Sequence, residues 1–331
     1  PLYTLNDVEK TVPRFKGIPP SQWLPILKDV KARFQYNGHI LGATYIELDI
    51  HGKHFVFSGD IGRTNDLLLY PPLKPTKADV LFIESTYGGR FHPEEEEAIP
   101  QIEKLVNDTI NKGGSLFVPS FSVERAQLMM LIFWRLLKED KIPKVQMIMD
   151  SPMGANVLEL FHRTRDWHRL EDNECDEMCS HFKVVSSYRE TMELRTDNKP
   201  KIVIAGSGML TGGRMLNYLE TQAQNPNNTL LFVGYQAEGT RGRKLLEGDK
   251  ELKVYGKWVP FKMQVAEIEG LSAHADHKEL MNWMSEIRNK PKRIFIVHGE
   301  KESAEALQKG IKETYDWDAE IPELYTITEI E

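Results

Sequence analysis

The spacing of apolar residues predicts strands that alternate with helices through the middle of the chain. Short continuous apolar runs, typical of buried strands, occur at 78–85, 113–120, 144–151, 201–208 and 229–236. Helical patterns lie between them, at 94–112, 123–139 and 213–222, with further helices between 151 and 190. Such alternation is typical of a mainly parallel sheet flanked by helices, so an α/β fold is predicted.

The two ends of the chain add further elements to this series. A short helix is predicted at 4–11. Residues 44–58 alternate between apolar and polar positions on both sides of a His-Gly pair, which predicts a β-hairpin. After residue 261 the pattern predicts a strand, a loop, a helix, a strand over 293–300 and a last helix over 301–314.

Composition narrows the class of protein. A chain of 331 residues suits one large or two medium domains, and 40% hydrophobic and 27% charged residues are ordinary for a soluble globular protein. We find neither a run of about 18 apolar residues nor a secretory signal, so we expect no membrane association and a cytoplasmic location. The net charge of −7 argues against a broad nucleic-acid-binding surface but not against a local site.

Cys175 and Cys179 are the only cysteines of the chain. So few cysteines in a chain of this size indicate an intracellular protein with reduced thiols. The run "CDEMCSH" raises the question of a metal site, but a structural zinc site needs four ligands. We therefore interpret the two cysteines as free thiols, one helical turn apart in an acidic, exposed segment.

Five polar residues stand where predicted strands end or where small residues surround them. They are His39, Asp60, Glu84, His274 and His298. In α/β proteins, catalytic and ligand-binding residues are commonly found at the carboxyl ends of strands. Imidazole and carboxylate are ligands that zinc prefers, and the two oxygens of an aspartate can bridge two ions.

Each of these residues also has a purely structural interpretation. A single histidine at a strand end is commonly a hydrogen-bonded core residue. Asp60 lies between Gly59 and Gly62, where it could simply form a turn. Glu84 could cap the backbone locally. The order and spacing of the five residues favour the functional interpretation.

Five stretches in this order, "GHILGA", "SGDIGR", "ESTYGGR", "SAHADH" and "VHGE", resemble the β-CASP branch of the metallo-β-lactamase superfamily. The stretches "PSFSVERAQ", "MDSPMGANV", "IAGSGMLTGGR" and "FVGYQAEGTRG" resemble it too, so the resemblance covers nearly the whole chain. It implies part of a four-layer αβ/βα sandwich, with a three-layer α/β domain inserted. The implied boundaries are 1–88 and 271–331 for the sandwich and 89–270 for the β-CASP domain.

The resemblance also implies a site. His39 matches a ligand of a first zinc, His298 a ligand of a second, and Asp60 the carboxylate that bridges both. His274 matches a residue that contacts the scissile phosphate and protonates the leaving group, with Glu84 orienting it. The implied activity is zinc-dependent hydrolysis of RNA with two ions, endonucleolytic and in some members also exonucleolytic.

Candidate substrate-binding residues follow from the same stretches. Arg125 lies in the first turn of a predicted helix, and Ser207 and Gly208 lie in a strand-to-helix loop whose backbone N–H groups suit a phosphate. Ser272 resembles a family position close to phosphate. The glycines of "GSGMLTGGR" could instead serve a tight turn, and their spacing is one residue too long for a dinucleotide-binding motif. Arg214, Arg241 and Arg243 add positive charge nearby in the sequence. We expect single-stranded RNA, gripped through its backbone.

The resemblance is incomplete at one place. The H-x-H-x-D-H run that supplies most zinc ligands in the superfamily is absent from the sequence, and in the family it lies upstream of the position of His39. We therefore expect that an N-terminal portion is missing and that this portion is needed to complete the metal site. Without it, we expect this chain alone to be inactive. The alternatives to a ribonuclease are a non-catalytic RNA-binding or assembly subunit and, less favoured, a small-ester or lactam hydrolase. A homodimer is one option for assembly.

Overall fold

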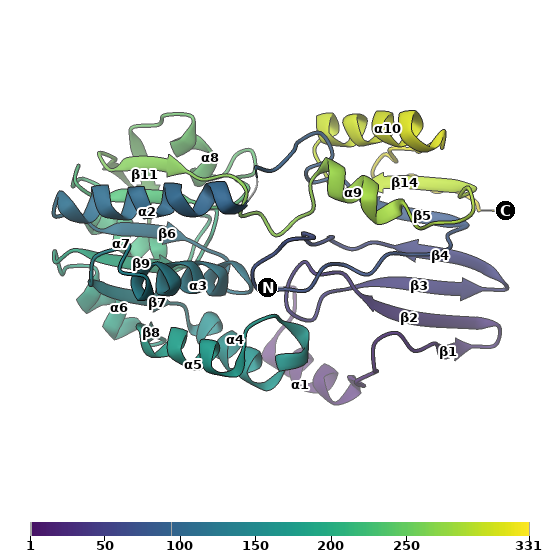
Figure 1. The fold of residues 1–331 in the computed structure, drawn as a ribbon, viewed down its shortest axis with the longest axis horizontal. Helices are drawn as coiled ribbons and strands as arrows, with labels where there is room; N and C mark the ends of the chain where they lie inside the picture. Colours follow the sequence, from purple (N-terminus) through teal and green to yellow (C-terminus); the bar gives the residue numbers. More distant parts are fainter. Residues whose placement is uncertain (1, 94, 331) are drawn as a thin grey trace.

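The computed structural model describes residues 2–93 and 95–330, which form two lobes that each contain a six-stranded sheet (Figure 1). The strand order is β1-β2-β3-β4-β5-β14 in the first lobe and β13-β10-β6-β9-β7-β8 in the second. A separate hairpin pairs β11 with β12. The chain builds five strands of the first lobe, crosses to the second lobe and returns for β14.

The first lobe has a mixed sheet. Its strands are β1 (Leu24–Leu27), β2 (Val30–Tyr36), β3 (Thr44–Ile50), β4 (Lys53–Phe57), β5 (Val80–Glu84) and β14 (Arg293–Val297). Neighbouring strands from β1 through β4 pair antiparallel, and β5 pairs in parallel with both β4 and β14. Helices α9 (His277–Met284) and α10 (Lys301–Tyr315) cover one face, where Leu81, Ile83 and Ile296 pack against Trp283 and Leu307. On the other face the rings of Phe57 and Phe82 stack while remaining partly exposed.

The second lobe has an entirely parallel sheet. Its strands are β6 (Leu116–Pro119), β7 (Gln146–Asp150), β8 (Phe182–Val185), β9 (Lys201–Ala205), β10 (Thr229–Phe232) and β13 (Gln264–Glu267). The hairpin strands are β11 (Glu251–Val254) and β12 (Lys257–Pro260). The helices are α2 (Glu95–Asn111), α3 (Arg125–Lys138), α4 (Pro152–Arg163), α5 (Asp172–Ser180), α6 (Tyr188–Leu194), α7 (Met215–Gln222) and α8 (Arg241–Leu246).

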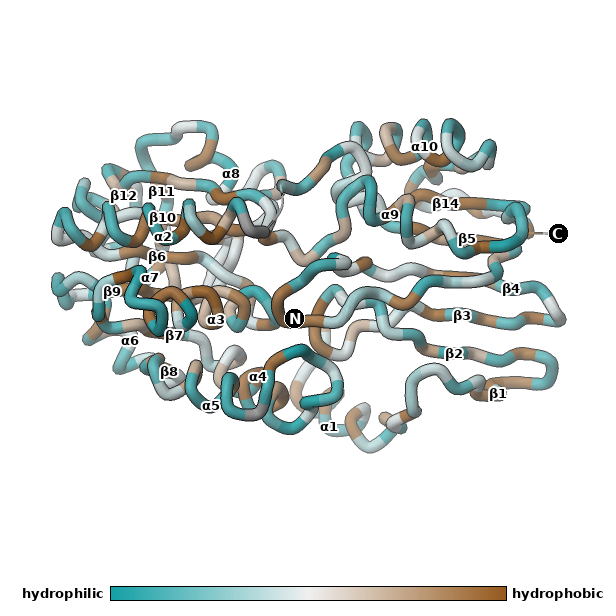
Figure 2. The backbone as a smooth tube through the Cα atoms, viewed as in Figure 1, coloured by the Kyte–Doolittle hydropathy of each residue, from teal (hydrophilic) through white to brown (hydrophobic). Residues whose placement is uncertain are grey.

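Alternate residues of this parallel sheet enter opposite cores, which produces three layers. On β6, Leu116 and Val118 join the core beneath α2 to α5, while Phe117 joins the core beneath α7 and α8. Both faces of the sheet are therefore buried, as expected for an all-parallel sheet with continuous apolar strands. Figure 2 shows these hydrophobic strands and the hydrophobic helix α3, whose residues Ala126–Trp134 are all buried.

The remaining helical segments lie outside these layers. They are α1 (Leu5–Thr11), which follows Thr4 as its N-cap, and two short 3₁₀ segments at Val12–Arg14 and Arg165–Trp167. Among the described residues, no helix combines the length and the apolar character that crossing a bilayer requires.

The structure confirms the mixed α/β fold, the 44–58 hairpin and the alternating strands and helices of the middle region. It differs in detail, because β8 lies in a region predicted to be only helical, and α8 and the β11–β12 hairpin were not predicted. In the described part of the first lobe, one sheet carries helices on one face, and a four-layer sandwich is not seen. The domain boundaries stay a prediction.

One further correction concerns the cysteines. Both thiols are free, as expected, but Cys175 is buried rather than exposed, and Cys179 is half-buried. Both sulfurs lie on the side of α5 that packs against the core of the second lobe.

Candidate metal-binding and catalytic site

Asp60 lies between two imidazoles. One carboxylate oxygen, Oδ2, is 3.7 Å from Nε2 of His39, and the other, Oδ1, is 3.3 Å from Nε2 of His298. Asp60 follows β4 and His298 follows β14, so the parallel pairing of β4, β5 and β14 brings them to the same edge of the sheet. The structure thus brings together all three residues that the sequence predicted as metal ligands.

The loops that carry His39 and Asp60 are held together by hydrogen bonds from a side chain and by a close backbone approach. The amide of Asn37 donates from Nδ2 to the carbonyl oxygens of Ser58 and Asp60, at 3.0 and 2.7 Å. Gly62 packs so closely that a Cβ there would lie 2.0 Å from the carbonyl oxygen of Gly38. Only glycine fits at Gly62, and this close approach fixes the separation of His39 and Asp60.

His39 is held as a neutral imidazole with one nitrogen aimed at Asp60. Its Nδ1 lies 3.3 Å from the carbonyl oxygen of Ala273 and donates to it, which leaves Nε2 facing the carboxylate. Burial, and secondarily the neighbouring His274, lower the pKa of His39 to about 4. At neutral pH its Nε2 lone pair is therefore free, as a metal ligand requires.

Glu84 and His274 form a buried pair beside these residues. Nδ1 of His274 lies 3.2 and 3.3 Å from the two carboxylate oxygens of Glu84, which is 1% exposed. Burial alone lowers the pKa of His274, but the hydrogen bond and charge of Glu84 outweigh it and raise that pKa above its usual range. Burial conversely raises the pKa of Glu84, and His274 outweighs it, so the net shift is downward. Both shifts favour an ion pair.

The donor set fits a zinc site. His39, Asp60 and His298 offer two imidazole nitrogens and a carboxylate, which are nitrogen and oxygen ligands that zinc accepts. Ligand atoms of His39, Asp60 and His274 all lie within 4.8 Å of one another. Because Nδ1 of His274 is engaged by Glu84, that histidine joins the cluster through its other nitrogen. The two oxygens of Asp60 point to different imidazoles, which suits a bridging carboxylate.

A cavity of about 470 Å³ lies beside the cluster and is lined by residues of both lobes. Among its lining residues are five that the sequence singled out: His39, Arg125, Gly208, Ser272 and His274. Arg125 begins α3 and is 6% exposed, and its Nη1 has no hydrogen-bond partner among the residues that the structure describes. A buried guanidinium with a free donor at the cavity wall is suited to an anionic group.

Not every predicted substrate-binding residue lines that cavity. Ser207 lies in a neighbouring hollow of about 570 Å³, which shares Phe121, Ser122 and Met153 with the first. Arg214 lines this second hollow and donates to the carbonyl oxygens of Ser186 and Ser187.

The two remaining arginines are engaged elsewhere. Arg241 donates to the carbonyl oxygens of Leu210 and Lys253, and Arg243 pairs with Glu247 at 2.8 Å. Arg243 also lines a third hollow, which includes Tyr87 and Ser272.

Sequence reasoning missed two residues that shape the site. Asn37 joins the two ligand loops, and its polar side chain directly after a strand was an available signal. Tyr87 packs against His274, with ring centroids 6.3 Å apart, and was quoted within a motif without being assigned a role.

The chain resembles known families along most of its length. Residues 126–245 match the Beta-Casp domain, and residues 258–322 match the Zn-dependent metallo-hydrolase RNA specificity domain. "Ribonuclease TTHA0252" of Thermus thermophilus is 31% identical over 321 residues, covering 93% of this chain and 72% of that protein. "RNase J-like protein" of Methanocaldococcus jannaschii is 30% identical, with 90% of this chain and 70% of that protein covered.

A second group of relatives is longer. "Transcription termination factor FttA" of Pyrococcus horikoshii is 31% identical over 327 residues, covering 94% of this chain but 50% of that protein. The chain therefore spans about half the length of these archaeal relatives.

Proposed function

This chain belongs to the β-CASP family of metallo-β-lactamase-type nucleases, and from that premise we propose that it hydrolyses RNA phosphodiester bonds with zinc held by His39, Asp60 and His298. The proposal rests on the position of Asp60, whose two oxygens face different imidazoles next to the Glu84–His274 pair. His39, Asp60 and His298 would hold the two zinc ions of the proposal. Zinc held there would supply a nucleophile at neutral pH and would neutralise charge on the phosphoryl oxygens.

His274 is the proton donor in this proposal. Glu84 binds Nδ1, so the other ring nitrogen, Nε2, is the one available to substrate. The hydrogen bond and charge of Glu84 raise the pKa of His274, which favours the protonated form that a general acid needs. The proton on Nε2 passes to the leaving oxygen as the P–O bond breaks, and Glu84 stabilises the imidazolium before transfer.

Arg125 and Ser272 position the RNA backbone. Both line the cavity beside His39 and His274, together with the loop residue Gly208. The free Nη1 of Arg125 donates to a phosphate oxygen. Ser207 lies in the adjoining hollow, where it contacts the next part of a single strand. Backbone contacts of this kind grip RNA without reading its sequence. Whether internal or terminal bonds are cut depends on how far the strand threads this cavity.

Isosteric substitutions in the full-length gene product test the proposal. Asp60→Asn and His298→Gln are each expected to lower bound zinc and abolish cleavage of a labelled single-stranded RNA. His274→Gln is expected to keep zinc and lower turnover by about 10²–10⁴-fold, the usual contribution of a general acid. His51→Asn is a matched control, because His51 is exposed in the β3–β4 turn.

The outcomes separate the alternatives. Unchanged cleavage by Asp60→Asn or His298→Gln would reject the assigned ligands. A wild-type protein that binds the RNA with zinc present but never cleaves it would instead indicate a non-catalytic RNA-binding subunit. Loss of zinc from His274→Gln would mean that His274 is a ligand rather than a proton donor.

A further inference from the structure

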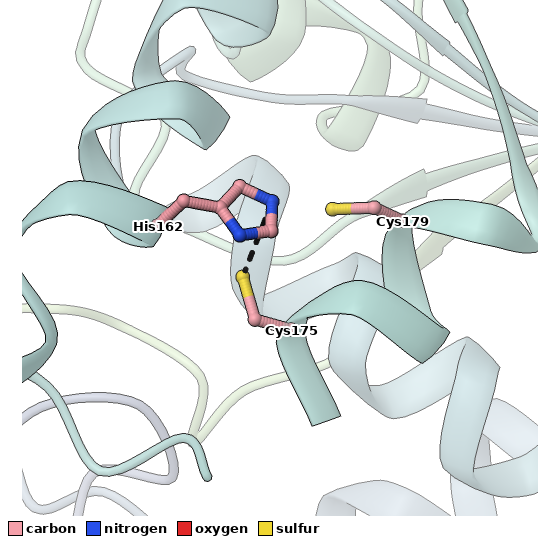
Figure 3. A group of neighbouring side chains, drawn as sticks. All are labelled: His162, Cys175 and Cys179. Atoms are coloured by element: carbon pink, nitrogen blue, oxygen red, sulfur yellow. Dashed lines mark hydrogen bonds between the residues drawn. The ribbon is translucent and has the colours of Figure 1, made fainter. Parts of the chain in front are cut away.

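A second cluster of metal-ligating side chains lies in the second lobe. Figure 3 shows His162 near the end of α4 facing Cys175 and Cys179 on α5. The ligand atoms of these three residues all lie within 4.8 Å of one another, and Sγ of Cys175 is 3.8 Å from Nε2 of His162. No residue of this cluster belongs to the candidate site described above.

The helices present these side chains for a structural reason. Cys175 and Cys179 are four residues apart on α5 and so lie on the same helical face. His162 follows Phe161, which is fully buried in the core that also contains Cys175 and Met178. Because both helices are anchored in one core, the thiols and the imidazole face each other across a fixed gap.

A carboxylate orients the imidazole. Oδ1 of Asp176 lies 3.3 Å from Nδ1 of His162, the nitrogen that does not face Cys175. A carboxylate bonded to the far nitrogen of a histidine is the arrangement that commonly fixes the ring of a metal ligand. Nε2 then carries the lone pair and points toward the sulfur.

We propose that His162, Cys175 and Cys179 bind one zinc ion, with Asp176 as a positioning residue and the fourth coordination position left to solvent. With Zn–S of about 2.3 Å and Zn–N of about 2.0 Å, sulfur and nitrogen ligands of a tetrahedral ion lie about 3.5 Å apart. The observed separation of 3.8 Å therefore needs little adjustment. Thiolate sulfur and imidazole nitrogen together favour zinc over magnesium or calcium.

Cysteine sulfurs bind zinc as thiolates, so binding releases their protons and weakens as the pH falls.

Cobalt substitution tests the site directly. Thiolate-to-cobalt charge transfer gives a near-ultraviolet absorption, and Cys175 and Cys179 are the only cysteines of the chain. The reduced wild-type chain is expected to gain this absorption with one equivalent of Co²⁺ and to lose it when zinc is added. The Asp60→Asn/His298→Gln double variant should keep the absorption, which separates this site from the other one.

Three variants complete the design. Cys179→Ser removes a half-buried ligand and is expected to abolish the two-thiolate absorption. His162→Gln should shift it and weaken zinc binding, measured by competition with a chromophoric chelator. Asp176→Asn should weaken zinc binding by about 10–100-fold while keeping the absorption, since it changes only the positioning of His162.

Three results would overturn the proposal. One is the absence of thiolate absorption in reduced protein that still titrates with two free thiols. Another is an absorption and an affinity that His162→Gln leaves unchanged. A disulfide between Cys175 and Cys179 under mild oxidation, with no zinc bound in the reduced form, would assign the thiols a redox role instead. None of these results bears on RNA cleavage, because the two sites share no residue.

Discussion

Glu84 and Asp150 occupy corresponding places in the two lobes. Each is the last residue of a strand that pairs in parallel with both neighbours, and each side chain is essentially buried. Burial raises the pKa of both carboxyls, yet the net shift is downward for Glu84 and upward for Asp150. The difference comes from what surrounds each carboxylate.

Glu84 meets only hydrogen-bond donors. Its oxygens accept from the backbone N–H of Ile61 at 2.6 Å and of Thr86 at 3.2 Å, and from His274. Asp150 accepts from the hydroxyl of Tyr218 at 2.7 Å, but Arg214 is 3.9 Å away, and within residues 2–93 and 95–330 Oδ1 has no hydrogen-bond partner. The partners of Glu84 thus outweigh its burial and stabilise the anion, whereas burial outweighs the partners of Asp150.

The amide isostere Glu84→Gln is expected to have the largest effect. The amide NH₂ would face a donor at whichever oxygen it replaces, and His274 would lose its counter-charge. Breaking a buried, hydrogen-bonded pair costs about 3–5 kcal/mol, so we expect a fall of that size in the free energy of unfolding at pH 7. Urea unfolding followed by circular dichroism, with a chelator present, measures it.

The control for this prediction is the paired change Glu84→Gln with His274→Gln. If the ion pair is the cause, the double variant should be less destabilised than the sum of the single changes. Additive losses, or a single loss below 1 kcal/mol, would mean that Glu84 acts mainly as a backbone cap, the structural interpretation that its sequence context also allowed.

His92 extends the comparison to a half-buried imidazole whose ring nitrogen bonds a backbone carbonyl and not a carboxylate. Its Nε2 lies 3.2 Å from the carbonyl oxygen of His274, and burial, followed by the charge of Arg63, lowers the pKa of His92 to about 4. The unfolded chain takes up this proton near pH 6.5, so stability is full above that pH and is lost as the pH falls toward 4. We expect a loss of about 2–3 kcal/mol from this residue.

Urea midpoints at a series of pH values from 7 to 4 check this, with His92→Gln as the comparison. The variant should show a shallower decline, because one proton fewer is taken up on unfolding. His39 has a similarly low pKa and remains in both proteins, so some slope persists. Identical slopes in the two proteins would show that His92 is already protonated in the folded state.

The sequence was informative where a local signal coincided with a structural demand. In the second lobe, the parallel strands had to be continuous apolar runs because both faces of that sheet are buried. In the first lobe, Asp60, Glu84 and His298 stood out because each is a polar residue at the end of a strand. Gly62, next to Asp60 in the same motif, also reflects a structural requirement, since only a glycine permits the contact with Gly38.

Other features depended on tertiary contacts that leave little local trace. The four-residue strand β8 lies between two helices, and its residues Lys183 and Val184 are exposed, so its pattern resembles a loop. The pairing of His162 with Cys175 joins two helices across a core, and the cysteines alone gave too few ligands to indicate a metal. Ser207 followed the expected loop but entered the neighbouring hollow, because the turn at the end of β9 faces Phe121 and Arg214.

The smallest effect is expected for Asp150→Asn, the isosteric counterpart of the change at Glu84. Because the pKa of Asp150 is raised, its ionised form costs stability, and that cost grows as the pH rises above 3.8 through the folded pKa. Asparagine keeps an oxygen for Tyr218 and removes the charge. Arg214 retains its bonds to Ser186 and Ser187.

We therefore expect a change below about 1 kcal/mol at pH 7, within the range of a single hydrogen bond. Asp150 alone lowers stability as the pH rises from 4 toward 7, against the rise that His92 and His39 produce, so the variant's stability should climb more steeply over this range. A loss as large as that of Glu84→Gln would mean that the Arg214–Asp150 contact is a true ion pair and that the two lobes hold their carboxylates alike.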